Sequence, residues 1–243
     1  WTHLVKTLKI TASPNYLRHN GKPVLAFRGF GDITRPPEDP QKALRMQNWF
    51  KHNPDPELRV TLMGTIPSRW RTLGSDSRAD RAWLEVYPNF DIIAPWTPGR
   101  YRDEAGVVKW RTGQLEPDVA EAKKYHQDYL AIMFPGFSWY NKKHSSSEPE
   151  PRNKTPRNGG KFLWSQAYHA QIGGATGAFI AMFDEVDEGT AIYIIAPNQD
   201  SVPAIPPGVD RYWLTLDADG YKLPSDWYLR VTREIGRMFK GTI

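Results

Sequence analysis

The sequence predicts an α/β fold built on a parallel sheet. Short apolar segments alternate with amphipathic segments of helical length along the 243 residues, and no repeat of fixed period or internal linker divides the chain. Strands separated by such helices pair in parallel through right-handed crossovers. Five predicted strands do not close a barrel of eight, so an open doubly wound sheet is the alternative, although its Gly-rich G-x-G-x-x-G turn is absent.

The predicted elements follow one another in regular order. A Gly21-Lys22-Pro23 turn precedes the first strand, and each strand is a mostly apolar run of the kind that is buried on both faces. Helices are predicted from apolar residues that recur at spacings of three and four, with Pro117 suited to a first helical position and Gly173-Gly174 to a helix end. The predicted strands are 24–30, 59–65, 90–96, 130–136 and 178–183. The predicted helices are 40–51, 80–86, one that starts at Pro117, 161–172 and 227–239, and residues 142–160 are predicted to be a surface loop.

Composition predicts one globular domain, residues 1–243, with a sizeable core, because 40% of the residues are hydrophobic and 13% are aromatic. The chain has no Cys, which excludes disulfides and thiolate metal sites, and its six His residues form no ligand pattern, so we expect neither a metal nor a cofactor.

The formal charge is +5, but Lys and Arg are scattered, which argues against nucleic acid as the partner. We expect no membrane span and no signal peptide, and a chain that starts at Trp1 is expected to be processed or part of a longer one.

The segment Phe183-Asp184-Glu185-Val186-Asp187-Glu188-Gly189-Thr190 carries the candidate chemistry. It follows the last predicted strand, and functional groups of parallel barrels gather just past the carboxyl ends of strands. Four carboxylates within five residues repel one another, so we expect one of them to keep its proton, as a general acid must. Glycoside cleavage needs such a protonated carboxyl and a second, ionised one. The alternatives are an acidic, solvated loop and a cation site.

Other strand ends add candidate substrate-binding residues. Aromatic rings stack on the apolar faces of sugars, and amide groups bind their hydroxyls, so these residue types favour a carbohydrate ligand over a phosphate. The alternative for each aromatic residue is packing in the core. The candidates are Arg28 after the first strand, Trp96, Arg100 and Tyr101 after the third, and Trp139, Tyr140 and Asn141 after the fourth, with Asp184 and Asp187 beside the two glutamates.

The segment from Asp184 to Ile192 resembles the Asn-Glu-Trp-His-Glu-Gly-Thr-Gln-Ile signature of glycoside hydrolase family 99, the endo-α-mannosidase and endo-α-mannanase group. It is closer still to relatives of that family called xylosidase/arabinosidase-like. Similar stretches recur in those relatives in the same order: Tyr16-Leu17-Arg18, Gly21-Lys22-Pro23-Val24, Pro95-Trp96-Thr97-Pro98-Gly99-Arg100, Phe134-Pro135-Gly136-Phe137-Ser138-Trp139 and Arg157-Asn158-Gly159-Gly160.

The resemblance implies a (β/α)8 TIM barrel and hydrolysis with retention of configuration. It implies that Glu185 acts as base on the sugar 2-hydroxyl, giving a 1,2-anhydro intermediate, and that Glu188 acts as acid and then as base. Val186-Asp187 stands where the family has Trp-His, which changes a sugar contact.

The resemblance also implies that the five strands correspond to strands four to eight of the barrel. We therefore expect the N-terminal β/α units to come from another segment, either cleaved and still bound or outside this sequence, since an unclosed barrel exposes strand edges.

Two functions besides hydrolysis stay open. The first is a lectin-like protein that binds carbohydrate without catalysis, and the second is a binder of anionic partners, which the sequence pI of about 9.3 favours. An extracellular or secreted location is expected mainly from the resemblance. The sequon Asn153-Lys154-Thr155 agrees with that location, although Pro156 directly after it disfavours glycosylation.

Overall fold

The computed structural model describes residues 1–143 and 150–243, so residues 144–149 of the predicted surface loop lie outside the described part of the chain. Its sheet has the strand order β1-β2-β3-β4-β5-β6, and the register is parallel from β2 to β5. The chain divides into two compact units. The first unit comprises residues 1–96 and 118–130, and the second comprises residues 97–117 and 131–243. The predicted alternation of parallel strands with helices is confirmed.

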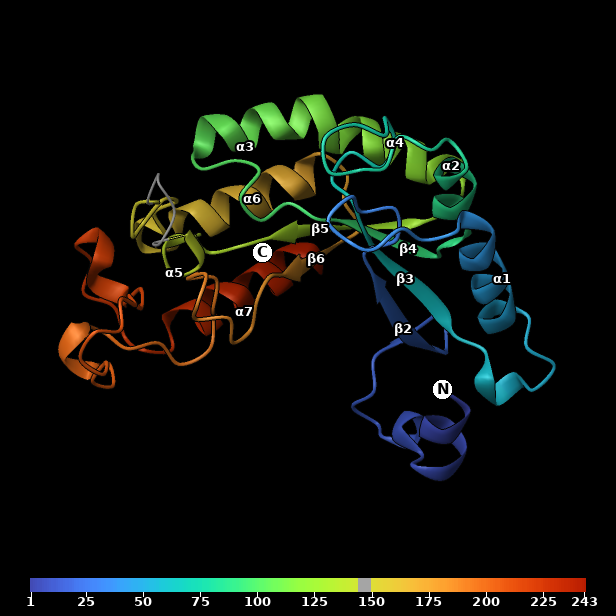
Figure 1. Ribbon diagram of the computed structural model, residues 1–243, viewed down its shortest axis with the longest axis horizontal. Coiled ribbons are helices and arrows are strands. Elements are labelled where there is room, and N and C mark those ends of the chain that lie inside the picture. Colours follow the sequence, from blue (N-terminus) through green and yellow to red (C-terminus); the bar gives the residue numbers. More distant parts are fainter. Residues whose placement is uncertain (144–149) are drawn as a thin grey trace. The chain divides into compact units, whose positions relative to one another are not determined.

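The first unit contains a short hairpin and a parallel sheet. β1 pairs antiparallel with β2, and Figure 1 shows β2, β3 and β4 side by side, each in register with the next. Helix α1 has the predicted bounds, and Asp39 caps its first turn by accepting a hydrogen bond from the backbone of Gln41 at 2.9 Å. The elements are β1 (Arg18–His19), β2 (Lys22–Arg28), α1 (Pro40–Lys51), β3 (Thr61–Ile66), α2 (Trp83–Val86), β4 (Ile92–Pro95), and the short turns His3–Thr7, Ile10–Ala12, Pro56–Leu58 and Tyr87–Asn89.

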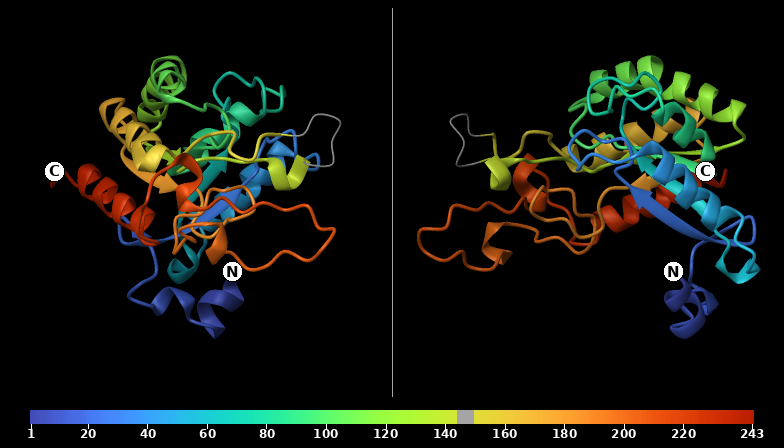
Figure 2. Two further views of the ribbon diagram at one scale, coloured as in Figure 1. Left: turned by 90° about the vertical axis from the view of Figure 1, so that its left-hand side faces the viewer. Right: turned by 45° about the vertical axis from the view of Figure 1, so that its right-hand side comes forward.

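The second unit contains α3, α5, α6, β6 and α7, and helix α6 packs against both α3 and α7. Helices α6 and α7 have the predicted bounds. In the described chain between β6 and α7, residues 181–226 form a long loop that contains two short 3-10 turns (Figure 2). The elements are α3 (Glu104–Trp110), α5 (Tyr140–Lys143), α6 (Lys161–Ile172), β6 (Gly177–Ile180), α7 (Trp227–Phe239), and the turns Arg111–Leu115, Asn158–Gly160, Gln199–Ser201 and Leu216–Asp219. Two elements, α4 (Glu116–Lys124) and β5 (Asp128–Met133), pass from one unit to the other.

Each predicted strand differs from the observed one by one to three residues at its ends, and one predicted helix starts too late. The helical run expected to start at Pro117 begins at Glu104, where Asp103 caps α3 by accepting a hydrogen bond from the backbone of Gly106 at 2.7 Å, and a π-helical turn joins α3 to α4. Pro117 is the second residue of α4, an early position where a missing N–H is tolerated. The last strand ends at Ile180 and not at Phe183, so three residues separate it from Asp184, the first carboxylate of the acidic segment.

Each unit has its own apolar core. In the first unit, every residue of β3 is buried and the ring of Phe90 lies against Gly64. In the second unit, a buried cluster joins Tyr101, Val107, Phe134, Phe137 and Phe162. Among the described residues, none of the helices combines the length and the apolar character needed to span a bilayer.

The contact between Gly64 and Phe90 gives the first prediction. A Cβ at position 64 would lie 2.7 Å from two ring carbons of Phe90, so we expect Gly64→Ala to lower the free energy of unfolding by about 1–3 kcal/mol. Gly236→Ala is the matched control, because a Cβ there meets nothing within 4 Å inside helix α7 and should stabilise the chain by about 0.5–1 kcal/mol. Urea unfolding of both variants tests this, and equal effects would contradict the close packing.

Candidate active site

The acidic segment is a loop closed by backbone hydrogen bonds. Met182 N–H donates to the carbonyl of Thr190 at 3.1 Å, and the N–H of Thr190 donates to the carbonyl of Glu185 at 3.1 Å. The Thr190 hydroxyl adds a bond of 3.4 Å to the same carbonyl, and Thr190 itself is buried. The Glu-x-x-Glu-Gly-Thr sequence therefore folds on itself, and the last residue of the motif fixes the backbone of the first.

Gly189 completes this loop with a backbone conformation that glycine adopts most easily. Its φ is +65°, in the left-handed region, and a side chain there would collide with Leu214. The carbonyl of Gly189 accepts a 2.7 Å hydrogen bond from Arg157 Nη2. Arg157 is buried, which lowers its pKa, while the Tyr228 ring 4.8 Å from its guanidinium favours the charged form.

Glu188 is held at both its backbone and its side chain. Its carbonyl accepts a 2.7 Å hydrogen bond from the N–H of Ser138, which lies past the end of β5. Lys142 Nζ contacts the Glu188 carboxylate, whose side chain is 18% exposed. One carboxylate oxygen of the predicted acid thus has a cation as its partner.

Glu185 and Asp187 face different neighbours. Glu185 Oε1 accepts a 3.2 Å hydrogen bond from the backbone of Asp187. The Asp187 carboxylate lies 3.9 Å from Arg211, and its carbonyl accepts a bond of 3.1 Å from Asn141 Nδ2. Asp184 is exposed. Because Lys142 and Arg211 lie beside two of the four carboxylates, their charges reduce the repulsion expected within the segment.

Asn141 links three segments from a buried position. Besides Asp187, its amide binds the backbone of Tyr212 in both directions, donating to the carbonyl at 2.9 Å and accepting from the N–H at 2.8 Å. The sequence predicts that Asn141 binds substrate. In the structure its amide binds the backbone of the acidic segment and of the Tyr212 segment, and a contact of Asn141 with substrate stays a prediction.

Tyr140 belongs to a cluster of aromatic and charged side chains beside Asn141. Its hydroxyl donates to Asp210 at 2.8 Å, and its ring centroid lies 6.4 Å from that of Tyr212. The guanidinium of Arg152 lies 5.2 Å from the Tyr140 ring and 4.8 Å from the Tyr212 ring. Trp139, 37% exposed, packs against Phe137 and has Lys154 Nζ at 5.9 Å from its ring.

The remaining predicted binding residues lie in three settings. Tyr101 is a correction, because its ring is buried in the core against Phe134 and its hydroxyl donates to Gln166 at 3.2 Å. Arg100 is exposed in the second unit. Arg28 and Trp96 belong to the first unit, where the guanidinium lies 3.8 Å from the centre of the indole, a cation–π contact.

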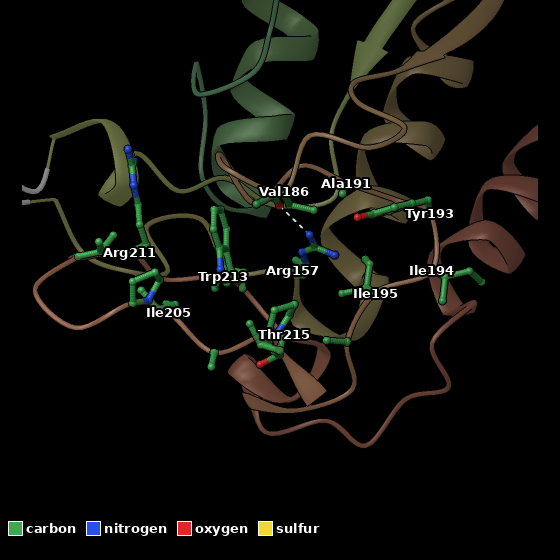
Figure 3. A pocket seen from close by; sticks show the side chains of 18 residues that line it. Arg157, Val186, Ala191, Tyr193, Ile194, Ile195, Ile205, Arg211, Trp213 and Thr215 are labelled. Atoms are coloured by element: carbon green, nitrogen blue, oxygen red, sulfur yellow. Dashed lines mark hydrogen bonds between the residues drawn. The ribbon is translucent and has the colours of Figure 1, made fainter. Parts of the chain in front are cut away.

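An apolar cavity of about 430 Å³ borders the acidic segment at Val186 and Gly189 (Figure 3). Ile195, Ile205 and Trp213, which follow that segment in the chain, also line the cavity. The four carboxylates are not among its lining residues. The two predicted catalytic residues, Glu185 and Glu188, therefore do not belong to this cavity.

The structure also bears on glycosylation and on metal binding. Asn153 Nδ2 donates to Asp219 and Thr155 is buried, so a glycan on Asn153 would break a contact of the folded chain. Within residues 1–143 and 150–243, no group of three His, Asp or Glu side chains is arranged to hold a metal ion.

The side chains that hold the site together are not predicted by the sequence. Lys142 and Arg211 contact the acidic segment through their side chains, and Ser138 contacts it through its backbone N–H. Each lies 24 or more positions from its partner along the chain, so no local spacing marks them. Arg157 stands in a stretch that carries the family resemblance, and this is the one signal that could have indicated its role.

The fold is similar to that of solved glycoside hydrolase structures. A family 99 endo-alpha-mannosidase from Bacteroides thetaiotaomicron matches with a TM-score of 0.65 and 16% identity, over 99% of this chain and 61% of that one. A second structure with that description, in complex with BIS-TRIS-propane, matches at 0.63 and 17% identity, over 99% and 64% of the two chains. A glycoside hydrolase-like protein matches at 0.55 and 14% identity, over 96% and 59%.

The predicted likeness to family 99 is thereby confirmed as a likeness of fold. This chain has the architecture of part of a (β/α) barrel, and it spans about three fifths of the length of the structures it matches. No family model and no curated protein matches the sequence.

The geometry of Gly189 gives the second prediction. Gly189→Ala should lower the melting temperature, because the left-handed φ costs a residue with a side chain about 1–2 kcal/mol and the new methyl meets Leu214. Gly208→Ala is the control, since its φ of +81° carries the same backbone cost while a Cβ meets nothing within 4 Å. Thermal unfolding followed by circular dichroism measures both, and equal shifts would show that the contact with Leu214 contributes nothing.

Proposed function

We propose that this chain forms the catalytic part of a retaining glycoside hydrolase that acts on a mannose-like or related glycan. The observation that carries the proposal is the acidic segment, in which Glu185 and Glu188 are fixed by Thr190 and Ser138 shortly after the last strand. The similarity of fold to family 99 structures supports the assignment, because functional groups of (β/α) barrels lie just past the carboxyl ends of strands.

The proposed reaction has two steps, taken from the family resemblance. In the first, Glu185 removes the proton of the sugar 2-hydroxyl, O2 bonds to C1, and the glycosidic bond breaks as Glu188 gives its proton to the leaving oxygen. In the second, Glu188 removes a proton from water, the water oxygen bonds to C1, and O2 leaves C1 and recovers its proton from Glu185. Both carboxyl groups end in their starting states, and the configuration at C1 is retained.

The proposal assigns substrate contacts to exposed and half-buried side chains of the predicted set. Trp139 offers a ring for stacking, and Tyr140, Asp184 and Asp187 offer hydrogen-bonding groups. Arg100 completes the proposed set in the second unit, whereas Arg28 and Trp96 belong to the first unit and stay sequence predictions. The contact of Lys142 with Glu188 requires that the ammonium move or bind the substrate when the leaving group approaches Glu188.

A lectin-like function is the second candidate, and the same ion pair favours it. A carboxylate held by Lys142 is suited to accepting hydrogen bonds from sugar hydroxyls, a role that needs no proton transfer. Val186 in place of a tryptophan also leaves the segment with one aromatic contact fewer than the family signature.

We further propose that additional β/α units complete the barrel beside β6. All four residues of β6 are partly exposed, whereas all six of β3 are buried, which is the difference expected between a strand that lacks a covering element and one that has it. The matched structures also contain more chain than this sequence.

The barrel proposal is tested by mass spectrometry of the protein purified from its natural source under non-denaturing conditions. We expect a further segment, covalent or tightly bound, in addition to the 27.9 kDa of this sequence. A single species of that mass, monomeric and folded, would contradict the proposal.

The catalytic proposal is tested by Glu185→Gln and Glu188→Gln. Each should lower kcat/KM on an α-mannoside substrate by a factor of about 100 or more, since general acid–base catalysis contributes roughly 10²–10⁴ in rate. Asp200→Asn is the matched control, because its carboxylate is exposed and lies outside the proposed site, so the rate should change little. Hydrolysis that persists in Glu188→Gln would end the hydrolase assignment. Glycan binding with no turnover in the unmodified protein would instead support the lectin-like function.

A further inference from the structure

A second site candidate lies on the helical face of the second unit. A groove of about 790 Å³ runs between α6 and α7 and reaches Glu104 at the start of α3. We call it the aromatic groove and define it by the rings of Trp164, Tyr168 and Trp227 together with Ser165 and His169. Its volume lies within the range of about 300–1,000 Å³ that small-ligand pockets occupy. The apolar cavity that borders the acidic segment shares none of these residues.

Two of the rings are exposed on one side of α6. Trp164 and Tyr168 are four residues apart, so they lie one above the other on the helix, and they are 38% and 50% exposed. Other residues of α6, such as Phe162 and Leu163, are fully buried. Large rings left open beside a hollow mark a binding surface more often than rings scattered singly over a protein.

The third ring is fixed in place by the turn before α6. Trp227 Nε1 donates to the carbonyl of Gly159 at 2.9 Å, which orients the indole at the start of α7. A Cβ on Gly160 would lie 3.1 Å from that nitrogen, so the glycine permits this close approach. A ring whose orientation is set before the ligand arrives loses little conformational entropy on binding.

Two lining residues carry polar atoms whose hydrogen bonding is incomplete. Within the described chain, Ser165 Oγ and His169 Nδ1 are buried and have no hydrogen-bond partner. Burial lowers the pKa of His169, and Arg111 lowers it further, so the imidazole is neutral at neutral pH. Buried polar atoms without partners are costly, so a shift of either side chain toward the groove that lets it bond to a ligand hydroxyl group is favourable.

The charges around the groove favour a neutral ligand. Glu104, Glu234, Lys161 and Arg230 bring both signs to its lining. Glu234 pairs with Arg237 at 2.9 Å and Arg230 with Asp226 at 2.9 Å, so part of this charge is already compensated. A strongly charged ligand would meet repulsion from one sign or the other, whereas a polyol can hydrogen-bond to both.

We propose that the aromatic groove is a second carbohydrate-binding site, which takes a neutral oligosaccharide by stacking on Trp164, Tyr168 and Trp227. The proposal does not depend on hydrolysis at Glu185 and Glu188. The groove offers aromatic faces on which the apolar sides of sugar rings can stack, and it offers hydrogen-bonding groups beside them. Its lining has no excess of either charge. Such a site would hold a glycan chain on the helical face while leaving the acidic segment free.

The test uses the whole chain and four neutral probes: mannotetraose, xylotetraose, arabinotetraose and maltotetraose. Saturation-transfer NMR identifies the probe that binds, and titration calorimetry measures its dissociation constant. We expect Trp164→Ala and Tyr168→Ala each to raise that constant by about tenfold, the loss expected when one stacking contact is removed. Trp164→Phe, which keeps a ring, should restore part of the affinity.

Two matched controls separate this site from the others. Trp49→Ala removes an equally exposed tryptophan on α1, 44% exposed, and should leave the dissociation constant unchanged. Glu185→Gln should also leave it unchanged, so a failure of the hydrolase proposal is distinguishable from a failure of this one. Circular dichroism checks that each variant is folded.

The proposal is overturned by any of three results. These are no binding of the four probes at millimolar concentration, binding that Trp164→Ala and Tyr168→Ala leave intact, and a dimer that Trp164→Ala converts to a monomer in light scattering. The last result would identify the groove as an interface between two copies of the chain.

Discussion

The geometry of the acidic segment depends on the backbone hydrogen bonds that close it. Thr190 binds the carbonyl of Glu185, and Ser138 binds the carbonyl of Glu188, so both glutamates are fixed through their main chain. Four carboxylates within five residues would otherwise favour an open, solvated loop. Fixed backbone bonds together with the cations Lys142 and Arg211 allow the segment to stay folded, and they leave the glutamate side chains as the part that can respond to a ligand.

The fold was largely predictable because its elements have strong local signals. Helices α1, α6 and α7 have the predicted bounds, since each combines apolar residues at helical spacing with a clear start or end, such as Asp39 or Gly173. Prediction failed where the structure depends on non-local or unusual backbone features. The run through α3 and α4 contains a π-helical turn, which shifts the apolar periodicity, so the spacing alone puts the start of the helix at Pro117.

The candidate site was predictable only in part. The acidic segment was found because its position after a strand and its residue types both point to chemistry. Its supporting contacts could not be found, because Lys142 and Glu188 are 46 positions apart and only the folded chain brings them together. Tyr101 was misassigned for a different reason. An aromatic residue after a strand can pack in a core or stack on a sugar, and the sequence does not distinguish the two.

The substitution within the signature gives the aromatic groove a physical rationale. Where the family signature has a tryptophan, this chain has Val186, which lines an apolar cavity instead of offering a ring to a sugar. Affinity lost there can be recovered by stacking elsewhere on the same glycan, because two weak contacts on one chain act at high effective concentration. Trp164, Tyr168 and Trp227 provide such rings within the same unit as Glu185 and Glu188. If both proposed sites bind the same glycan, the expected ligand is a polymer long enough to reach both surfaces.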